Sequence, residues 1–272
     1  MNTSVWTGYY TGLPVSEAIS RLRKAGFAYG ELSHDHAERL LAEGKPSEVG
    51  ARLRSFADGE GYRLTQGHLS FVGGLLSPEV NDLQKRQLEL FAAIGIENAV
   101  LHFNGGKELA PEEMFDRRVE AVRQLQGCVA GSDLYLCLEN LGSEPVTHTA
   151  DKLLHIIGCV GGGNLGICLD TGHLHLVNGL GQAQQSQREF ILTAGAHLRA
   201  LHITENNGKN DVHQMPYSAR YGIDWESVVT ALRDVDYQGL FNLEILGERN
   251  APDPIKTAKL RFIREMTGYL LG

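Results

Sequence analysis

Residues 201–213, LHITENNGKNDVH, gather side chains that bind metal ions and exchange protons. Two imidazoles and two carboxylates fall within these thirteen residues: His202, Glu205, Asp211 and His213. Imidazole nitrogens and carboxylate oxygens are common ligands of divalent cations, and both groups also act as general acids or bases. One loop does not define a site by itself, so its partners must come from other parts of the chain.

Similar side chains stand at the ends of several short apolar runs. In chain order they are Glu31, His68, His102, Glu139, Asp170, His173, His202 and Glu244. Histidine makes up only 11 of the 272 residues, so its recurrence at the ends of three such runs indicates a shared place in the fold. Isolated buried ions are strongly destabilising. A converging set of these groups therefore needs a cation as partner.

The apolar runs are typical of β-strands, and they alternate with segments of helical period. Eight candidate strands cover residues 4–10, 27–33, 63–70, 98–104, 134–141, 165–173, 198–206 and 241–246. The intervening segments, 77–95 and 111–131 among them, begin with Ser or Pro and end at Gly, as helix start and stop signals predict. A strand, a helix and two loops need about 30 residues. Eight such units predict an α/β fold, a single (β/α)8 TIM barrel in one domain spanning residues 1–272.

In such a barrel the C-terminal ends of the strands form the rim of the active site. The runs that end at Glu139, Asp170, His202 and Glu244 are successive, so these four side chains are expected to point inward together. Three carboxylates and one imidazole make an oxygen-rich set of ligands. This set favours one divalent ion, Mn²⁺, Mg²⁺ or Co²⁺, and is also compatible with Zn²⁺.

Composition excludes several other classes of protein. The formal net charge is −8 and the pI is about 5.8, which disfavours a nucleic-acid partner because phosphate binding needs clustered Lys and Arg. No apolar run reaches the ~18 residues of a membrane span, and the N-terminus lacks the features of a signal peptide. Without a close CxxC pair, the cysteines at 128, 137, 159 and 168 are expected to be free thiols in a reducing cytoplasm, with Cys137 and Cys168 buried.

Six motifs together resemble the xylose-isomerase-like barrel superfamily: LENL at 138–141, LDTGH at 169–173, LHITEN at 201–206, DVH at 211–213, YGIDW at 221–225 and LEI at 243–245. That group includes sugar and keto-sugar isomerases and epimerases, and zinc-dependent apurinic-site endonucleases. The resemblance covers nearly the whole chain. It implies a metal-dependent isomerase or epimerase of carbohydrate metabolism that acts on a ketose or keto-sugar through an enediolate. Homodimers and homotetramers are common in the families it resembles.

The resemblance also implies roles for individual residues. Glu139, Asp170, His202 and Glu244 resemble the metal ligands of the keto-sugar epimerases, with Glu139 and Glu244 as the catalytic acid–base pair. His173 resembles the histidine that holds substrate hydroxyls. Further substrate-binding candidates at the predicted rim are His68, His102, Arg220 and Glu31, while Asp211 and His213 are candidates for additional metal or substrate ligands. Asp224 is expected to cap the helix that follows it, and the remaining histidines, His34 and His36 among them, are expected to be structural.

Alternative functions use the same groups. A dehydratase, or a lyase acting on a keto-sugar or 3-keto-glycoside, would share the first proton abstraction. A zinc-dependent apurinic-site endonuclease is another alternative, since nine residues resemble its trinuclear zinc ligands: His68, His102, Glu139, Asp170, His173, His202, Asp211, His213 and Glu244. The first strand lacks the Gly-x-His-Val opening of those nucleases and the chain is acidic, which argues against it. A non-catalytic sugar-binding module or partner subunit is the third class.

Overall fold

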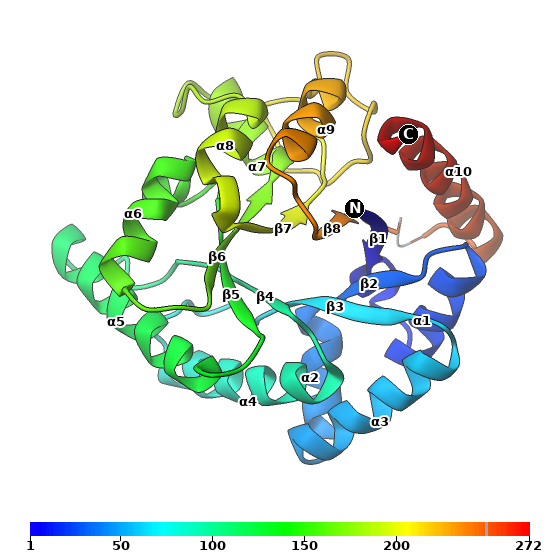
Figure 1. Ribbon diagram of the computed structural model, residues 1–272, viewed down its shortest axis with the longest axis horizontal. Coiled ribbons are helices and arrows are strands. Elements are labelled where there is room, and N and C mark those ends of the chain that lie inside the picture. Colours follow the sequence, from blue (N-terminus) through cyan, green and yellow to red (C-terminus); the bar gives the residue numbers. More distant parts are fainter. Residues whose placement is uncertain (248–249) are drawn as a thin grey trace.

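The structure, a computed structural model, describes residues 1–247 and 250–272. Within this part of the chain, parallel strands form one eight-stranded sheet in the order β7-β6-β5-β4-β3-β2-β1-β8. The sheet curls until β7 and β8 meet through an isolated bridge between Ile203 and Leu243, which gives the ring seen in Figure 1. The strands are β1 (Asn2–Trp6), β2 (Tyr29–Leu32), β3 (Arg63–His68), β4 (Asn98–Leu101), β5 (Tyr135–Glu139), β6 (Leu165–Asp170), β7 (Leu198–His202) and β8 (Leu240–Leu243). The predicted (β/α)8 TIM barrel is confirmed.

Helices surround the barrel in the expected alternation with the strands (Figure 1). Ser33 and Ser77 cap α2 and α4, and proline opens α3, α4 and α5, as helix start signals predict. No helix in the described ranges is long and apolar enough to cross a membrane. The helices are α1 (Val15–Lys24), α2 (His34–Ala42), α3 (Pro46–Gly59), α4 (Pro78–Ile94), α5 (Pro111–Val129), α6 (Ala150–Val160), α7 (Thr171–Gly179), α8 (Gln187–Ala194), α9 (Trp225–Asp234) and α10 (Asp253–Leu271).

Each predicted strand is present, but several are shorter than predicted. Residues 7–10 do not continue β1: they form a 3-10 helix, η1 (Thr7–Tyr10). Likewise β6 ends at Asp170, whose side chain accepts a hydrogen bond of 2.7 Å from the backbone N–H of His173 and so starts α7. The predicted end of that strand at residue 173 was therefore wrong, because an N-cap interrupts the apolar run.

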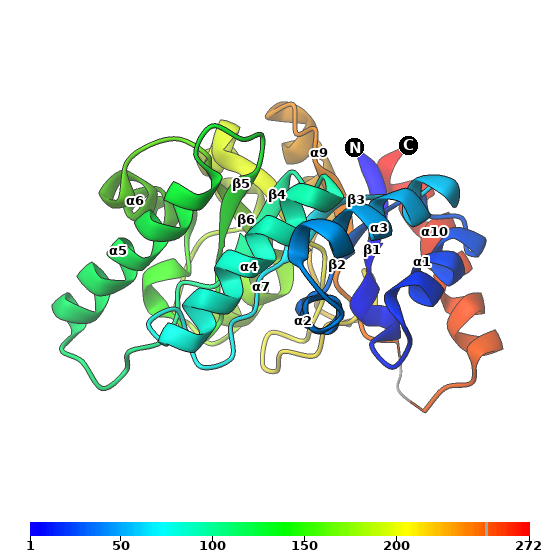
Figure 2. The same cartoon turned by 90° about the horizontal axis from the view of Figure 1, so that it is seen from below.

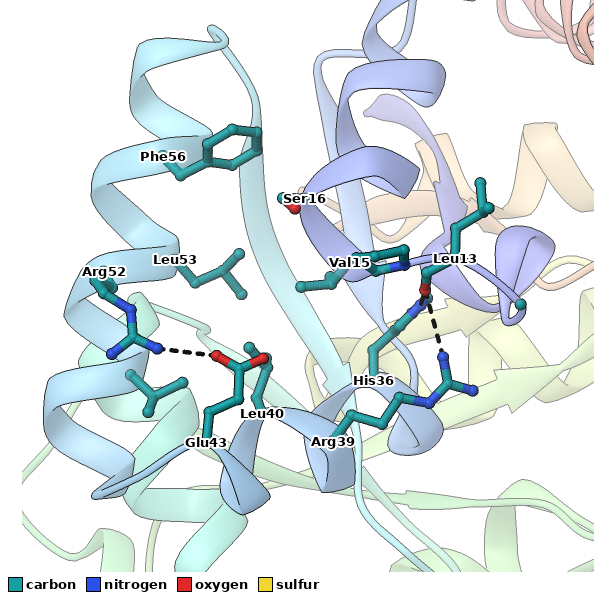
Figure 3. Close-up of a pocket in the computed structure, with 13 residues that line it drawn as sticks. Leu13, Val15, Ser16, His36, Arg39, Leu40, Glu43, Arg52, Leu53 and Phe56 are labelled. Carbon is teal, nitrogen blue, oxygen red and sulfur yellow. Dashed lines mark hydrogen bonds and ion pairs between the residues drawn. The ribbon is translucent and has the colours of Figure 1, made fainter.

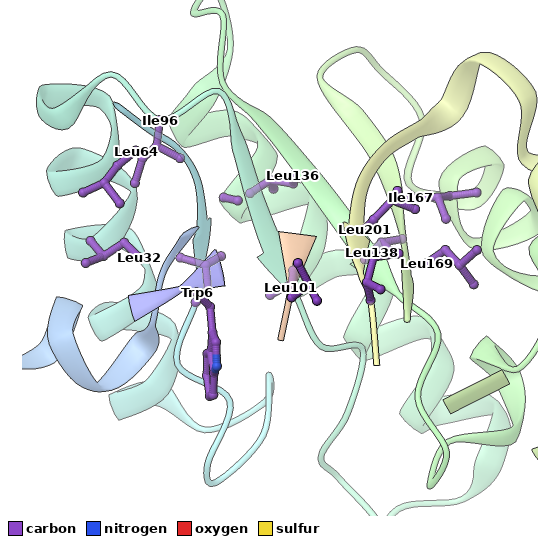
Figure 4. Packing of buried hydrophobic residues seen from close by; sticks show 14 of the residues in the cluster. Trp6, Leu32, Leu64, Ile96, Leu101, Leu136, Leu138, Ile167, Leu169 and Leu201 are labelled. Carbon is purple, nitrogen blue, oxygen red and sulfur yellow. The ribbon is translucent and has the colours of Figure 1, made fainter. Parts of the chain in front are cut away.

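The two faces of the strands carry different residues. Leucine and isoleucine side chains, including Leu136, Leu138 and Leu169, belong to the main hydrophobic cluster (Figure 4). The alternate positions Val100, Cys137, Cys168 and Ala200 form a second, small cluster and are all 0% exposed. Side chains along a strand point alternately to opposite faces. The residues two positions farther along each of these four strands therefore continue the same face, and they are His102, Glu139, Asp170 and His202.

The cysteines have the state that the sequence predicts. All four cysteines lie in the described ranges and are free thiols; Cys137 and Cys168 are buried, as predicted, while Cys128 and Cys159 are exposed.

The C-terminal ends of the strands face downward in Figure 2, where the long loop of residues 203–224 extends below the barrel. That loop carries most of the segment that is rich in potential metal ligands.

Candidate metal centre

The strand ends bring the predicted metal ligands together at one point. Glu139, Asp170 and His202 are the last residues of β5, β6 and β7, and Glu244 follows β8 directly. Nδ1 of His202 lies 3.3 Å from Oε1 of Glu139 and 3.5 Å from Oε2 of Glu244. Glu139 and Asp170 offer ligand atoms within 4.8 Å of each other. All four side chains are buried.

The ligand set fits a divalent cation. Among the described residues, the buried atoms Nδ1 of His202 and Oδ2 of Asp170 have no hydrogen-bond partner. Buried polar atoms are almost always paired, and leaving one unpaired is costly. Both atoms belong to the predicted quartet, whose other ligands are carboxylate oxygens. A cation bound here would satisfy these atoms and offset the charge of the carboxylates.

Glu31 lies beneath this set rather than in the cavity above it. The sequence predicts Glu31 as a substrate contact, but its side chain is 0% exposed and does not line the cavity described below. Its Oε2 accepts a 3.0 Å hydrogen bond from Nε2 of His202 and a 2.8 Å bond from Asn242, and Gln66 donates to the same oxygen. Glu31 therefore holds the Nε2 proton of His202, which makes Nδ1 the nitrogen available to a metal ion.

The charges of these groups act strongly on one another. Burial raises the pKa of Glu139, but His202 and His102 lower it by more, so it lies well below its ordinary value. Burial lowers the pKa of His202, but acidic neighbours, Cys168 and Glu244 first, raise it well above its ordinary value. Burial raises the pKa of Glu244. Protons and a metal ion therefore compete for the same positions, as is usual at metal sites.

Above the quartet lies a cavity of about 600 Å³, which we call the metal cavity. Apolar side chains form part of its wall: Trp6, Phe71, Leu141, Leu176 and Leu246. The rest of the lining includes the predicted histidines and the carboxylates of Glu139, Asp211 and Glu244. Oε2 of Glu139 lies 3.0 Å from Nε2 of His102 and 3.5 Å from Nε2 of His68, and Oε1 of Glu139 lies 3.2 Å from Nδ1 of His173. The volume of the metal cavity is within the range of about 300–1,000 Å³ that is typical of small-molecule sites.

A second group of potential ligands borders the same cavity. His173, Asp211 and His213 offer ligand atoms within 4.8 Å of one another. Oδ2 of Asp211 is 3.2 Å from Nε2 of His173, and Nε2 of His213 is 3.4 Å from Oδ1 of Asp211. Nδ1 of His213 donates to the backbone oxygen of Glu244 at 2.9 Å. Asp211 and His213 therefore lie beside the quartet, and His213 contacts it through Glu244.

Glu205, the other carboxylate of the segment 201–213, has a structural role. Its two buried oxygens accept hydrogen bonds from the backbone N–H groups of residues 218, 219 and 223 and from the indole of Trp225. These bonds fold the loop of residues 203–224 back onto β7, and so they hold Asp211 and His213 over the cavity. Asp224 caps α9 by accepting from the backbone N–H of Ser227 at 3.0 Å, as predicted.

His34 and Arg220 do not lie where the sequence predicts. His34, expected to be structural, lines the metal cavity; its ring centroid is 5.7 Å from that of His68, and its Nδ1 has no hydrogen-bond partner among the described residues. Its position directly after the predicted strand end at Ser33 was an available signal. Arg220 is exposed, with its guanidinium 5.5 Å from the centre of the Tyr221 ring, and it does not line the cavity.

Another cavity, of about 640 Å³, lies between α1, α2 and α3 (Figure 3). Its polar side chains are largely paired with one another or with the backbone. Nε2 of His36 is 3.0 Å from the carbonyl of Leu13, and Arg52 donates to Glu43 at 2.9 Å. His36 therefore has the structural role expected of it, and this cavity holds no cluster of metal-binding groups among the described residues.

Part of the chain is similar in sequence to a known protein. Over 168 residues the chain is 23% identical to the uncharacterized protein y4fM of Sinorhizobium fredii (strain NBRC 101917 / NGR234), which covers 60% of this chain and 51% of that protein. The chain thus spans about half the length of this relative. No activity follows from the likeness.

Solved structures resemble the whole chain. D-psicose 3-epimerase from Clostridium cellulolyticum H10, in a structure with D-tagatose, superposes with a TM-score of 0.82 at 20% identity, over 100% of this chain and 99% of that one. An L-ribulose 3-epimerase superposes with a TM-score of 0.78 at 17% identity, over 99% and 94%. At such identities the likeness shows the fold alone. The sequence itself matches the family described as "Xylose isomerase-like TIM barrel" over residues 19–266, and the chain therefore belongs to the xylose isomerase-like TIM barrel family.

Proposed function

We propose that this protein is a metal-dependent sugar isomerase or epimerase that acts on a ketose or keto-sugar. The observation that carries the proposal is the placement of two buried carboxylates, Glu139 and Glu244, on either side of His202 at the floor of the metal cavity. The 3-epimerases that share this fold support the reaction class. One divalent ion, held by Glu139, Asp170, His202 and Glu244, would polarise the substrate carbonyl and acidify the neighbouring C–H bond.

The two glutamates are the proposed acid–base pair. They come from β5 and β8, which are separated by two strands around the barrel, and so they approach the substrate from different sides. One carboxylate removes the proton beside the carbonyl, which gives an enediolate, and the other returns a proton to the opposite face. This exchange inverts one carbon in an epimerase. In an isomerase the proton returns to the adjacent carbon instead.

The surrounding side chains orient the substrate. Burial lowers the pKa of His173, but Asp170 and Asp211 raise it well above its ordinary value, and Nε2 of its ring, 3.2 Å from Oδ2 of Asp211, is the nitrogen placed to meet sugar hydroxyls. Its Nδ1 is fixed by the carbonyl of Asn140 at 2.9 Å. His102, at 3.0 Å, holds the carboxylate of Glu139 in place. The apolar wall excludes water from one side of the substrate.

Solvent exchange tests the acid–base assignment directly. The Mn²⁺-loaded protein is incubated with a ketose in D₂O, and deuterium at the carbon beside the carbonyl is followed by NMR. Glu244→Gln should reduce the exchange by about 100-fold or more, the usual contribution of a general acid or base. Glu38→Gln, which alters a carboxylate bound to Ser70 outside the cavity, is the control. Undiminished exchange in Glu244→Gln would remove Glu244 from the acid–base role.

Other reactions can use the same first step. A dehydratase or a lyase on a keto-sugar or 3-keto-glycoside would also show deuterium exchange, and would differ by releasing water or an aglycone. The second ligand group of His173, Asp211 and His213 favours one further alternative, a zinc-dependent apurinic-site endonuclease. The net charge of −8 argues against it. A salt titration with an abasic duplex decides this point, since lack of binding at low salt excludes the nuclease.

A further inference from the structure

A second, larger cleft opens beside the metal cavity on the same face of the barrel. This side cleft has a volume of about 1,120 Å³ and lies between the loop after β1, the start of α2, the loop of residues 203–224 and the first turns of α10. His213 and Leu246 line both the side cleft and the metal cavity. Nδ1 of His213 is 3.3 Å from Oε2 of Glu244. The side cleft therefore begins one side chain away from the proposed acid–base pair.

Cationic side chains gather in this cleft although the chain is acidic. Arg39, Lys256 and Lys259 line it, together with Asp35 and Asp253. The carboxylate of Asp253 lies 2.5 Å from the guanidinium of Arg21, which also pairs with Glu17 at 2.6 Å. Among the described lining residues, Asp35 is the carboxylate that has no Lys or Arg partner; its partner is His34. Among the described residues of the lining, three cationic side chains outnumber two carboxylates, so the balance of charge there is positive.

The structure fixes Arg39 and Lys256 in place but leaves both able to bind a ligand. Arg39 donates from Nη1 to the backbone oxygen of Leu13, as Figure 3 shows, and also to that of Thr11. A guanidinium has five N–H donors, so others remain for a ligand. Buried Tyr9 donates from its hydroxyl to the backbone oxygen of Lys256 at 3.1 Å and so anchors the first turn of α10. The ammonium group of Lys256 has no hydrogen bond or ion pair to any described residue.

We propose that the substrate carries a terminal oxyanion, a phosphate ester or a carboxylate, and that Arg39 and Lys256 bind it in the side cleft. Arg and Lys are the side chains that recognise such oxyanions, whereas a neutral sugar needs hydroxyl and amide partners instead. In a ketohexose, C2 and C6 are about 5 Å apart when the chain is extended. With the carbonyl at the metal quartet, a group on C6 can be directed toward His213, the side chain that lines both the metal cavity and the side cleft. The inference rests on the proposed function for the position of the carbonyl.

The test compares three ketoses that differ at C6: fructose, fructose 6-phosphate and fructuronate. Turnover is followed by deuterium exchange on the Mn²⁺-loaded protein, and binding is measured by titration calorimetry. We expect kcat/KM to be higher for one of the charged ketoses than for fructose, and the difference between phosphate and carboxylate identifies the oxyanion. Lys256→Met should lower the ratio of charged to neutral kcat/KM about tenfold or more, the usual effect of losing a hydrogen bond to a charged group. Arg39→Met should act in the same direction.

Lys45→Met is the matched control, because Lys45 is exposed on the surface and pairs with Glu48 outside the side cleft. Its ratio of charged to neutral kcat/KM should equal that of the unmodified protein. Equal or better use of fructose by the unmodified protein overturns the inference and leaves the proposed epimerase intact. If none of the three ketoses exchanges deuterium, the proposed function fails for these sugars, and the binding data still decide the inference. Charged ligands that bind no tighter than fructose, or that bind Lys256→Met equally well, would then overturn it.

Discussion

Replacing Glu31 by glutamine tests whether the metal centre depends on a carboxylate that lies behind one of its ligands. Oε2 of Glu31 accepts hydrogen bonds from Nε2 of His202 at 3.0 Å and from Asn242 at 2.8 Å, and all three side chains are 0% exposed. The carboxylate keeps the proton of the imidazole on Nε2. Nδ1, within 3.5 Å of both Glu139 and Glu244, is then free to bind a metal ion.

The size of the effect follows from what glutamine keeps and what it loses. Glutamine has the same shape and retains one oxygen for His202, so the backbone should not move. It loses the negative charge that makes the imidazole a better ligand, and such changes behind a metal-bound histidine weaken metal binding by about 10- to 100-fold. That range corresponds to about 1.4–2.7 kcal/mol. Oε1 of Glu31 has no hydrogen-bond partner among the described residues, so an amide NH₂ placed there would also be unpaired, at about 1–3 kcal/mol of stability.

Competition with a chelator of known Mn²⁺ affinity measures the first effect, and urea denaturation of the metal-free protein measures the second. Glu144→Gln is the matched control, since Glu144 is another buried glutamate, bound to Arg118 at 3.0 Å outside the lining of the metal cavity. It should lower the free energy of unfolding and leave the Mn²⁺ affinity unchanged. If Glu31→Gln bound Mn²⁺ as tightly as the unmodified protein, or if both variants lost affinity equally, the reasoning about His202 would be wrong.

Two further predictions concern stability. Removing metal with a chelator should lower the temperature of unfolding, and Mn²⁺ should restore it. The reason is that a ligand at 100 times its Kd stabilises the folded state by about 2.7 kcal/mol. Calorimetry at constant ionic strength measures the change, and identical melting curves with and without metal would contradict the prediction. Gly30→Ala should cost about 1–3 kcal/mol, because the added Cβ would lie 2.0 Å from the hydroxyl of buried Tyr62. Urea denaturation measures the effect. Gly12→Ala is the control, because no atom lies within 4 Å of its new Cβ. Equal stability of the two variants would contradict the packing argument.

The barrel could be predicted from the sequence because its strands are buried on both faces. Each strand therefore appears as an apolar run, and the regular spacing of the runs leaves room for a helix after each. The ends of the strands were harder to predict. After β6 the residues remain compatible with a strand, but the side chain of Asp170 caps the next helix and turns the chain. That event depends on a hydrogen bond between neighbouring residues, which an apolar pattern does not record.

The candidate site was predictable to the extent that it follows the alternation of strand residues. Glu139, Asp170 and His202 lie on the inward face and end their strands, so residue type and position were sufficient. The roles of His34 and His36 could not be separated this way, although they are two residues apart. On a helix they point about 200° apart, and only the packed orientation of α2 shows that His34 faces the metal cavity while His36 bonds to Leu13.

Electrostatics connects the proposed metal centre with the proposed oxyanion subsite. Glu139, Asp170 and Glu244 bring three carboxylates to the barrel axis, Glu31 adds a fourth behind His202, and a divalent ion would offset two of these charges. An oxyanion beside the reacting carbonyl would therefore meet net negative charge in an environment that screens it poorly. The cations of the side cleft lie beyond His213, on the far side from these carboxylates. A charged substrate would therefore bind more tightly with its oxyanion in the side cleft than with its oxyanion at the metal quartet. The carboxylates that hold the metal ion would in this way also decide which end of the sugar reaches the ion.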